Sequence, residues 1–168
     1  QLEHISNIQR LYEKDFVWMD KFTVRNLELY QSNSPEGVTL LDVIDATISP
    51  MGGRMLKRWL ALPLKNIEEI RTRHDVVRYF IQQEDDLEFL DYQLDQISDL
   101  ERLISKFATG KIIPREVVLL NNSLEAILPI REKALNSENK TLVALGEEIV
   151  PNLKLIEQIT STLEENAP

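Results

Sequence analysis

Apolar residues recur every three or four positions along most of this chain, which is the spacing of an amphipathic helix. Such stripes predict helices over 1–14, 39–46, 50–62, 67–81, 84–109 and 114–135. A loop is predicted at 136–139, and a long final helix over 141–165 carries the clearest stripe: Leu142, Leu145, Ile149, Leu153, Ile156, Ile159 and Leu163. The pattern therefore predicts a mostly α, multihelical fold.

Residues 16–30 have a different pattern. The run Phe16-Val17-Trp18-Met19 is short and apolar, which is typical of a buried strand. Residues 24–30 alternate loosely between apolar and polar, and a turn follows at 33–37. We therefore expect a small extended β element near the N-terminal side.

Several residues predict where helices begin, end or bend. Asn66, with Glu69 three positions later, has the spacing of a capping box, and Gly110 is placed to end the 84–109 helix. Pro129 and Pro151 fall inside helical patterns, where proline removes a backbone hydrogen bond and crowds the preceding turn. Each of these two helices should therefore kink or break.

The most informative segment is 45–64, which contains a helix start, two glycines and a proline stop. Ser49 and Pro50 suit the first positions of a helix, and Pro63 ends it. Gly52 and Gly53 in the first turn would let another backbone come close. The apolar stripe consists of Met55, Leu56, Trp59 and Leu60. The segment predicts a tightly docked structural helix.

Composition narrows the class of protein. The chain has 168 residues, enough for one domain with its own core, and it has no cysteine for disulfides or thiolate sites. We see no signal peptide and no apolar run long enough to span a membrane, so we expect no membrane partner. Because the chain begins with Gln1 and stops abruptly at Pro168, we expect it to be part of a longer protein.

Charge bears on nucleic-acid binding. The net charge is −9, with 19 basic residues against 28 acidic ones. Because affinity for the phosphate backbone comes largely from clustered Lys and Arg, the chain by itself should bind DNA poorly.

Candidate chemistry is sparse. The two histidines, His4 and His74, lack further ligands at metal-binding spacing, and His74 on an apolar stripe is expected to be a packed core residue. The acidic residues lie mostly on predicted helix faces and helix starts, as solvated side chains do. Gly52-Gly53 is not part of a Gly-x-x-x-x-Gly-Lys-Ser/Thr phosphate loop. We assign no catalytic, cofactor-binding or metal-binding residue.

One group of charges is better placed for a structural role. Glu101 and Arg102 flank apolar Leu100 and Leu103, so their charged groups should be partly buried and paired. The candidate partners are Arg54, Arg58 and Arg73. A buried pair is strongly destabilised when one partner is removed, whereas an exposed pair contributes little. We favour the partly buried network over the exposed pair.

Five pieces of the chain, in order, resemble the core domain of the MutS family of DNA mismatch-repair proteins. They are Asp20-x-x-Thr23-x-x-Asn26-Leu27-Glu28-Leu29; Leu40-Leu41 with Asp45-x-Thr47; Met51-Gly52-x-Arg54 with Trp59-Leu60 and Pro63-Leu64; Ile70, Arg73, Val77 and Phe80; and Asp99-Leu100-Glu101-Arg102-Leu103. The resemblance begins near Phe16 and is clearest up to Pro114-Arg115. Its structural motif residues are Asn26, Asp45, Thr47, Met51, Gly52, Gly53, Arg54, Trp59, Pro63, Arg73, Asp99, Glu101 and Arg102.

The resemblance implies a core and lever domain. It divides the chain into a connecting helix at 1–15, the core at 16–135, and the start of a lever helix at 136–168 that leads toward a clamp domain. The implied role is mechanical: the domain couples binding of mismatched DNA to the ATPase of the whole protein. The chain itself would not be an enzyme, whereas the whole protein would be a DNA-dependent ATPase.

The resemblance also implies partners and a location. The whole protein would use ATP and Mg, bind mismatched double-stranded DNA, contain the other MutS domains and form a homodimer. It would be cytoplasmic in a bacterium, associated with the nucleoid, and act in repair of DNA damage.

The same composition is compatible with two other functions. One is a free-standing acidic helical protein–protein interaction module, and the other is a small helical enzyme, for which we find no supporting residues. The apolar stripe at 141–165 also needs covering. It either folds back on the 114–135 helix or pairs with a second copy, and we expect a dimer to cover what folding back leaves exposed.

Overall fold

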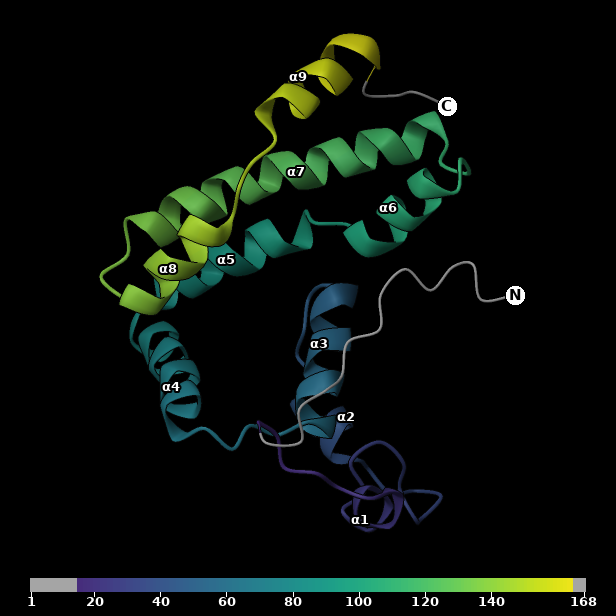
Figure 1. Cartoon of the computed structure of the whole chain (residues 1–168), viewed down its shortest axis with the longest axis vertical. Helices are drawn as coiled ribbons and strands as arrows, with labels where there is room; N and C mark the ends of the chain where they lie inside the picture. Colours follow the sequence, from purple (N-terminus) through teal and green to yellow (C-terminus); the bar gives the residue numbers. More distant parts are fainter. Residues whose placement is uncertain (1–14, 165–168) are drawn as a thin grey trace. The chain divides into compact units, whose positions relative to one another are not determined.

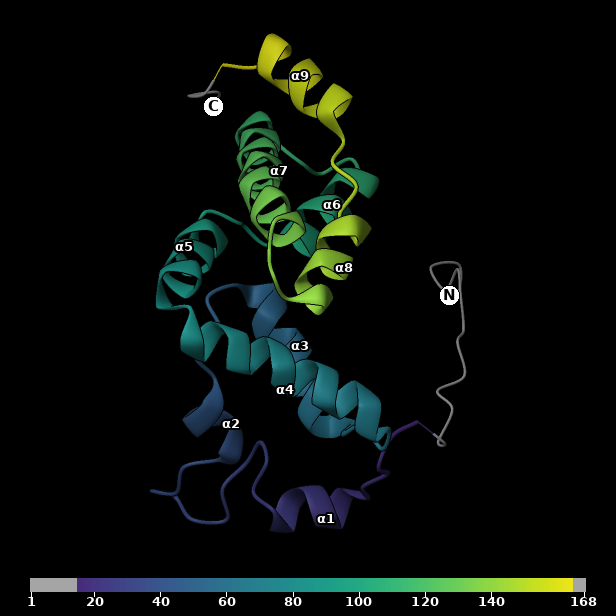
Figure 2. The ribbon, with the colours of Figure 1, turned by 90° about the vertical axis from the view of Figure 1, so that its left-hand side faces the viewer.

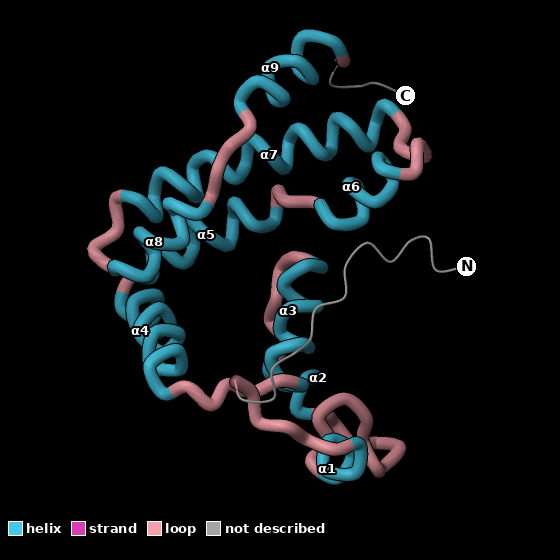
Figure 3. The backbone as a smooth tube through the Cα atoms, viewed as in Figure 1, coloured by secondary structure: helices cyan, strands magenta, loops and turns pink. Residues whose placement is uncertain are grey.

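The structure is a computed structural model that describes residues 15–164 (Figure 1). Over that range it contains nine helices and no strand (Figure 3). The helices are α1 Lys21–Asn26, α2 Leu40–Ile44, α3 Pro50–Ala61, α4 Ile67–Gln82, α5 Glu84–Asp95, α6 Leu100–Ala108, α7 Pro114–Leu135, α8 Lys140–Glu148 and α9 Leu153–Thr162. The prediction of a mostly α fold is confirmed, whereas the helix predicted over 1–14 lies outside the described residues.

The chain forms two compact units, which we describe separately. Of the described residues, unit 1 contains 15–44 and 57–71, and unit 2 contains 45–56 and 72–164. Unit 1 thus holds α1, α2 and the second half of α3, and unit 2 holds the first half of α3 and all of α5 to α9.

The end of helix α1 and the turn after it occupy residues 24–30, where an extended segment was predicted, so that prediction is wrong. The carboxylate of Asp20 accepts a hydrogen bond of 2.6 Å from the backbone N–H of Thr23, which caps the start of the helix. At the other end Glu28 has a φ of 49°, the left-handed conformation that closes a helix. The N–H of Leu29 then reaches back to the carbonyl of Val24. Local capping therefore favours a helix over the loose alternation.

The strand predicted at 16–19 is also wrong. It is reduced to a single antiparallel bridge between Phe16 and Leu64, in which the N–H of Val17 donates to the carbonyl of Pro63 at 2.7 Å. Both Val17 and Trp18 are exposed. Because Pro63 has no N–H, it cannot return a hydrogen bond, and the ladder does not extend through it.

Helix α2 begins at a reciprocal pair of side-chain bonds. The N–H and the hydroxyl of Thr39 donate to one carboxylate oxygen of Asp42, at 3.0 and 2.7 Å, while the N–H of Asp42 donates to the Thr39 hydroxyl at 3.1 Å. The hydroxyl bond, followed by the backbone bond, holds the pKa of Asp42 below its usual value. Thr39, Leu29 and Leu41 are buried residues of unit 1. A helix of five residues thus depends on its cap.

Unit 2 is organised around α7, whose bounds agree with the predicted helix over 114–135. Helices α5, α6, α8 and α9 all contact it, with α8 and α9 against different parts of its length (Figures 1 and 2). The buried apolar residues of this unit are Ile97, Leu103, Leu120, Ala126 and Ile159. The long apolar stripe of α7 therefore forms the centre of the core.

The single helix predicted over 84–109 is wrong, because the chain breaks between α5 and α6. The carboxylate of Asp99 accepts a hydrogen bond from the N–H of Arg102 at 3.2 Å and caps a new helix. Just before it, the N–H of Ser98 donates to the hydroxyl of Ser123 at 3.0 Å. Since Ser123 is fully buried on α7, this bond fixes the break to the core.

The other predicted helix ends have different outcomes. Gly110 has a φ of 64° and follows α6, as predicted. Pro151 breaks the helix predicted over 141–165 into α8 and α9, and Asn152 caps the second part. Pro129 lies inside α7, which continues through it, so the alternative of a break is wrong there. Both α8 and α9 fold back on α7, which buries Ile159 of the stripe and leaves Leu145 and Leu153 exposed, while dimer formation stays a prediction.

Candidate functional site

The motif segment begins with a side-chain turn. One carboxylate oxygen of Asp45 accepts hydrogen bonds from the N–H of Thr47 at 3.1 Å and from its hydroxyl at 2.6 Å. A Cβ added at Gly52 would lie 3.4 Å from the Thr47 Cβ, and one at Gly53 would lie 3.2 Å from the Thr47 hydroxyl. The Thr47 side chain of the preceding loop thus packs against the two glycines. Within residues 15–164 the nearest neighbours of a Cβ at either glycine are side-chain atoms, and the close approach of another backbone stays a prediction.

Helix α3 starts as the sequence predicts. The N–H of Gly52 donates to the hydroxyl of Ser49 at 3.1 Å, and Pro50 occupies the first helical position. Serine at this place satisfies a backbone N–H that the helix leaves without a partner, and proline has no N–H to satisfy. The start of the helix is therefore fixed within a turn of the two glycines.

Arg54 joins α3 to the start of α6 inside unit 2. Its two Nη atoms donate to the two carboxylate oxygens of Asp99, at 3.0 and 2.8 Å. Its Nε donates to Glu101 at 2.8 Å, and Nη2 lies 2.5 Å from the same Glu101 oxygen. The two-pronged contact with Asp99 is the geometry in which arginine binds a carboxylate most specifically. Because Asp99 is also the cap of α6, Arg54 holds the cap and the helix start together.

The electrostatics agree with this geometry. Hydrogen bonds from Arg54 hold the pKa of Asp99 below its usual value, and Asp99 followed by Glu101 raises the pKa of Arg54. The Asp99 side chain is 21% exposed, against 48% for Arg54 and 69% for Glu101. Arg54, one of the three candidate arginines, binds both acidic residues. The expected burial is wrong for Glu101 and for Arg102, which is also exposed, and Asp99 is the shielded member.

The apolar stripe of α3 is less covered than predicted. No residue of this helix is buried, Met55 is 55% exposed and Trp59 is 43% exposed. The prediction of a tightly docked helix is therefore wrong for the described residues. In unit 1 the second half of α3 is nevertheless held, because the hydroxyl of Tyr30 donates to the carbonyl of Lys57 at 2.7 Å.

The structure places the remaining motif residues as follows. Asn26 is exposed at the last position of α1, Pro63 offers its carbonyl to the bridge in unit 1, and Met51 is half-buried on α3. Arg73 is half-buried on α4. His74 is exposed, so its prediction as a core residue is wrong.

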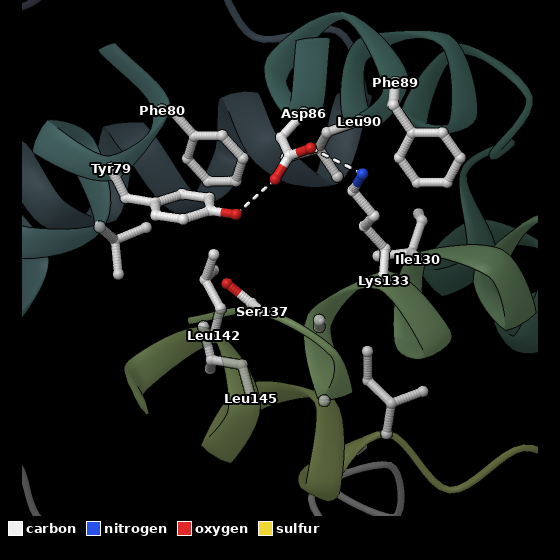
Figure 4. Close-up of a pocket in the computed structure, with 14 residues that line it drawn as sticks. Tyr79, Phe80, Asp86, Phe89, Leu90, Ile130, Lys133, Ser137, Leu142 and Leu145 are labelled. Carbon is white, nitrogen blue, oxygen red and sulfur yellow. Dashed lines mark hydrogen bonds and ion pairs between the residues drawn. The ribbon is translucent and has the colours of Figure 1, made fainter. Parts of the chain in front are cut away.

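A second candidate site, which the sequence did not indicate, is a cavity of about 340 Å³ in unit 2. It is lined mainly by apolar side chains of α4, α5, α7 and α8, among them Phe80, Phe89, Leu142 and Leu145. Figure 4 shows the aromatic rings and a row of polar groups on one side, with Leu142 and Leu145 opposite. Its size and lining are those of sites that hold small apolar groups.

The polar row consists of three side chains from three helices. The hydroxyl of Tyr79 donates to Asp86, and the ammonium of Lys133 lies 2.6 Å from the other Asp86 oxygen (Figure 4). Lys133, then Tyr79, lower the pKa of Asp86, while Asp86 raises the pKa of both partners. Lys133 also lies 5.6 Å from the ring centre of Phe89, a cation–π distance. These charges neutralise one another, so the row offers no net charge to a ligand.

Sequence reasoning missed this cavity for a physical reason. Asp86 falls in the acidic start of α5, where a carboxylate is explained by the helix dipole alone. Lys133 falls in the last turn of α7, where a cation is equally expected. Only the fold shows that the two meet.

Residues 15–164 contain neither a metal-binding cluster nor a membrane-spanning helix. No group of three or more acidic or histidine side chains is placed to hold a metal ion there. Over the same range, every helix is too short or too polar to cross a bilayer.

The chain matches known proteins along its whole length. The family model of MutS domain III matches residues 22–168. Proteins named DNA mismatch repair protein MutS from Flavobacterium psychrophilum and Flavobacterium johnsoniae are each 54% identical over 168 residues, which is 100% of this chain and 19% of theirs. One of the same name from Phocaeicola vulgatus is 46% identical, with the same coverage. This chain spans about a fifth of the length of these relatives. It belongs to the MutS domain III family.

Proposed function

We propose that this chain is the core domain of a longer MutS-like mismatch-repair protein, in which it couples binding of mismatched DNA to ATP turnover. The observation that carries the proposal is the Arg54 contact, seen in a chain that matches MutS domain III over residues 22–168. A domain with this role needs rigid elements that are fixed at defined points, because coupling between distant sites travels through such elements.

Helix α3 is an element that is fixed at defined points. Its first half lies in unit 2, where Arg54 binds the Asp99 cap of α6. Its second half lies in unit 1, where Tyr30 binds the carbonyl of Lys57. A continuous helix with a fixed point in each half transmits a rotation or a shift along its axis more faithfully than a loop does. We infer that α3 is one of the elements through which the domain couples its neighbours.

The partners follow from the same proposal. The longer protein would bind mismatched double-stranded DNA, use ATP and Mg²⁺ in another domain, form a homodimer and act on nucleoid DNA in the cytoplasm. The chain itself would turn over no nucleotide, since its sequence has no Gly-x-x-x-x-Gly-Lys-Ser/Thr loop. With a net charge of −9 its own affinity for DNA should be weak, sensitive to salt and indifferent to mismatches.

The test is the substitution Arg54→Ala in the longer protein. ATP turnover is measured without DNA, with a matched duplex and with a mismatched duplex. We expect the stimulation by the mismatch to fall by about fivefold or more, while turnover without DNA is unchanged.

The matched control is Arg78→Ala, which removes the same side chain from an exposed pair with Asp75 in the same unit. It should leave the stimulation as it is. If Arg54→Ala and Arg78→Ala behave alike, the coupling role of the Arg54 contact is contradicted. A free-standing interaction module, in contrast, would work without any ATPase attached, and the match to a domain of longer proteins does not favour it.

A further inference from the structure

The apolar cavity of unit 2 has walls that a ligand can reach. Its volume is about 340 Å³, and all of its lining residues fall within 76–149, inside unit 2. Its wall side chains Phe80, Phe89 and Leu142 are half-buried, and Leu145 is 48% exposed. A molecule that enters the cavity therefore contacts these side chains directly (Figure 4).

The charged side chains of the wall are already paired with each other. Asp86 accepts the Tyr79 hydroxyl on one carboxylate oxygen and binds Lys133 through the other. A charged ligand would lose its hydration in the cavity and would find each opposite charge already neutralised. A neutral ligand has no such cost, so the cavity selects a neutral molecule.

Aromatic rings in the wall set a preference among neutral molecules. Tyr79 and Phe80 form an edge-to-face pair, with ring centres 5.4 Å apart and planes at 81°. Figure 4 shows these two rings on one side of Asp86 and the ring of Phe89 on the other. Aromatic rings gain from edge-to-face and offset contacts beyond the apolar area that they bury. The wall therefore favours an aromatic ring over an aliphatic ring of the same size.

We propose that this cavity binds a free, neutral aromatic molecule of about two fused rings. An apolar cavity of ~150 Å³ is enough for one benzene ring, and this cavity has about twice that volume. The ligand lies between the aromatic side of the cavity and the side formed by Leu142 and Leu145. The proposal does not depend on the coupling role of the domain.

The test uses 5-fluoroindole, which is neutral and has two fused rings, as the probe. Its fluorine NMR line is followed on addition of the longer protein and, separately, of the 168-residue chain. We expect saturable broadening with both proteins and displacement of the probe by naphthalene. The probe 5-fluoroindole-3-acetate has the same rings and an added carboxylate, and it should bind about tenfold more weakly or less. Equal binding of the two fluorinated probes would overturn the proposal.

Two adjacent valines of α4 provide a matched pair of variants. Val76 is half-buried and lines the cavity, so Val76→Phe adds a ring inside it, and affinity for 5-fluoroindole should fall about tenfold or more. Val77 is 57% exposed and does not line the cavity, so Val77→Phe should bind the probe as the unchanged protein does. Equal affinities in the two variants would place the probe elsewhere and overturn the proposal.

A second pair of variants tests the opposite wall and applies if Val76→Phe does not fold. Leu142→Trp fills the cavity from α8 and should also weaken binding about tenfold or more. The control Leu153→Trp makes the same change at an exposed position of α9 outside the cavity, and it should keep the affinity. Circular dichroism shows which variants retain their helices, and equal affinities in this pair would also reject the site.

The last arms test the aromatic preference and the source of the ligand. Phenol and cyclohexanol each carry one hydroxyl on a six-membered ring, and phenol should displace the probe at about two- to tenfold lower concentration. Equal displacement would contradict the preference for an aromatic ligand. Binding of the probe by the 168-residue chain without binding by the longer protein would overturn the proposal, because another segment of the longer protein would then fill the cavity.

Discussion

The two units of this chain are stabilised in different ways. In unit 2 the buried apolar residues lie on α6, α7 and α9 and in the connection before α6, and they gather around a helix of 22 residues. In unit 1 the helices α1 and α2 have six and five residues, too few to be stable without outside support. Their support comes from the Asp20 cap, the Thr39–Asp42 pair and the Glu28 turn. One unit depends on apolar packing, and the other on local polar contacts.

The difference decides which parts of the fold can be read from the sequence. Periodic apolar residues report packing over many turns, and they predicted α7 with its observed bounds. They do not report a cap or a left-handed residue, and the extended segments predicted in unit 1 are wrong for that reason. Local capping signals such as Asp20 with Thr23 were present in the sequence and could have indicated α1.

The largest expected effect is on the core of unit 2. Leu120→Ala leaves a cavity beside α7, where Leu120 is buried, and should lower the free energy of unfolding by ~2–5 kcal/mol. Both tryptophans, Trp18 and Trp59, lie in unit 1, so their fluorescence follows unit 1, while circular dichroism mainly follows the longer helices of unit 2. In urea the dichroism transition should move to lower concentration more than the fluorescence transition does.

The control for that experiment is Leu153→Ala on α9, which removes an exposed leucine and should shift neither transition appreciably. If Leu120→Ala moves both transitions equally, the two units unfold together, and the contrast between them does not extend to stability.

The break between α5 and α6 shows what the sequence could not supply. It depends on Ser98 binding the hydroxyl of Ser123, 25 residues away, and on Arg54 binding Asp99, 45 residues away. The apolar periodicity of residues 84–109 carries no information about either hydrogen bond, and so it predicted one continuous helix. The resemblance to a family named Arg54 and Asp99 among its motif residues, but it did not show that the two side chains are hydrogen-bonded to each other.

The second expected effect is a loss of stability at one of two glycines in unit 2 that each lie close to neighbouring atoms. A Cβ at Gly146 on α8 would lie 3.0 Å from the Cβ of Ala134 and 3.2 Å from the backbone nitrogen of Leu135. Because backbone cannot move aside cheaply, Gly146→Ala should lower stability by ~1–3 kcal/mol despite its better helix propensity. The measurement is the urea midpoint by circular dichroism.

Gly53→Ala is the matched comparison. Its added Cβ would meet the Thr47 hydroxyl at 3.2 Å, an atom on a side chain that can rotate. A propensity gain of up to ~1 kcal/mol should then offset the crowding, leaving stability nearly unchanged. If Gly53→Ala were the more destabilising change, the Asp45–Thr47 turn would be more rigid than α8 packed on α7.

A third effect, of moderate size, concerns Trp59 in unit 1. A fully buried tryptophan costs ~3–5 kcal/mol when truncated to alanine, but Trp59 is 43% exposed, so Trp59→Ala should cost ~1–2 kcal/mol. Differential scanning calorimetry gives the value without relying on the lost fluorophore. The control Trp59→Phe keeps most of the apolar contact and should lose less. A loss near 4 kcal/mol would mean that α3 is packed as tightly as its sequence suggested.

The smallest expected effect is an acid dependence that tests the polar contact of unit 2. Because Arg54 lowers the pKa of Asp99 in the folded chain, the pair stabilises the fold above the unfolded pKa of about 4, and that contribution is lost as pH falls through the lowered value. Arg54→Ala should therefore be less stable than the unchanged chain at neutral pH, and the difference should shrink on acidification, as measured by urea unfolding at several pH values. The control Arg78→Ala, from a pair in which both side chains are more than half exposed, should change stability little at any pH. A difference for Arg54→Ala that stays constant from neutral to acid pH would show that Arg54 acts by packing its stem, and not through the charge of Asp99.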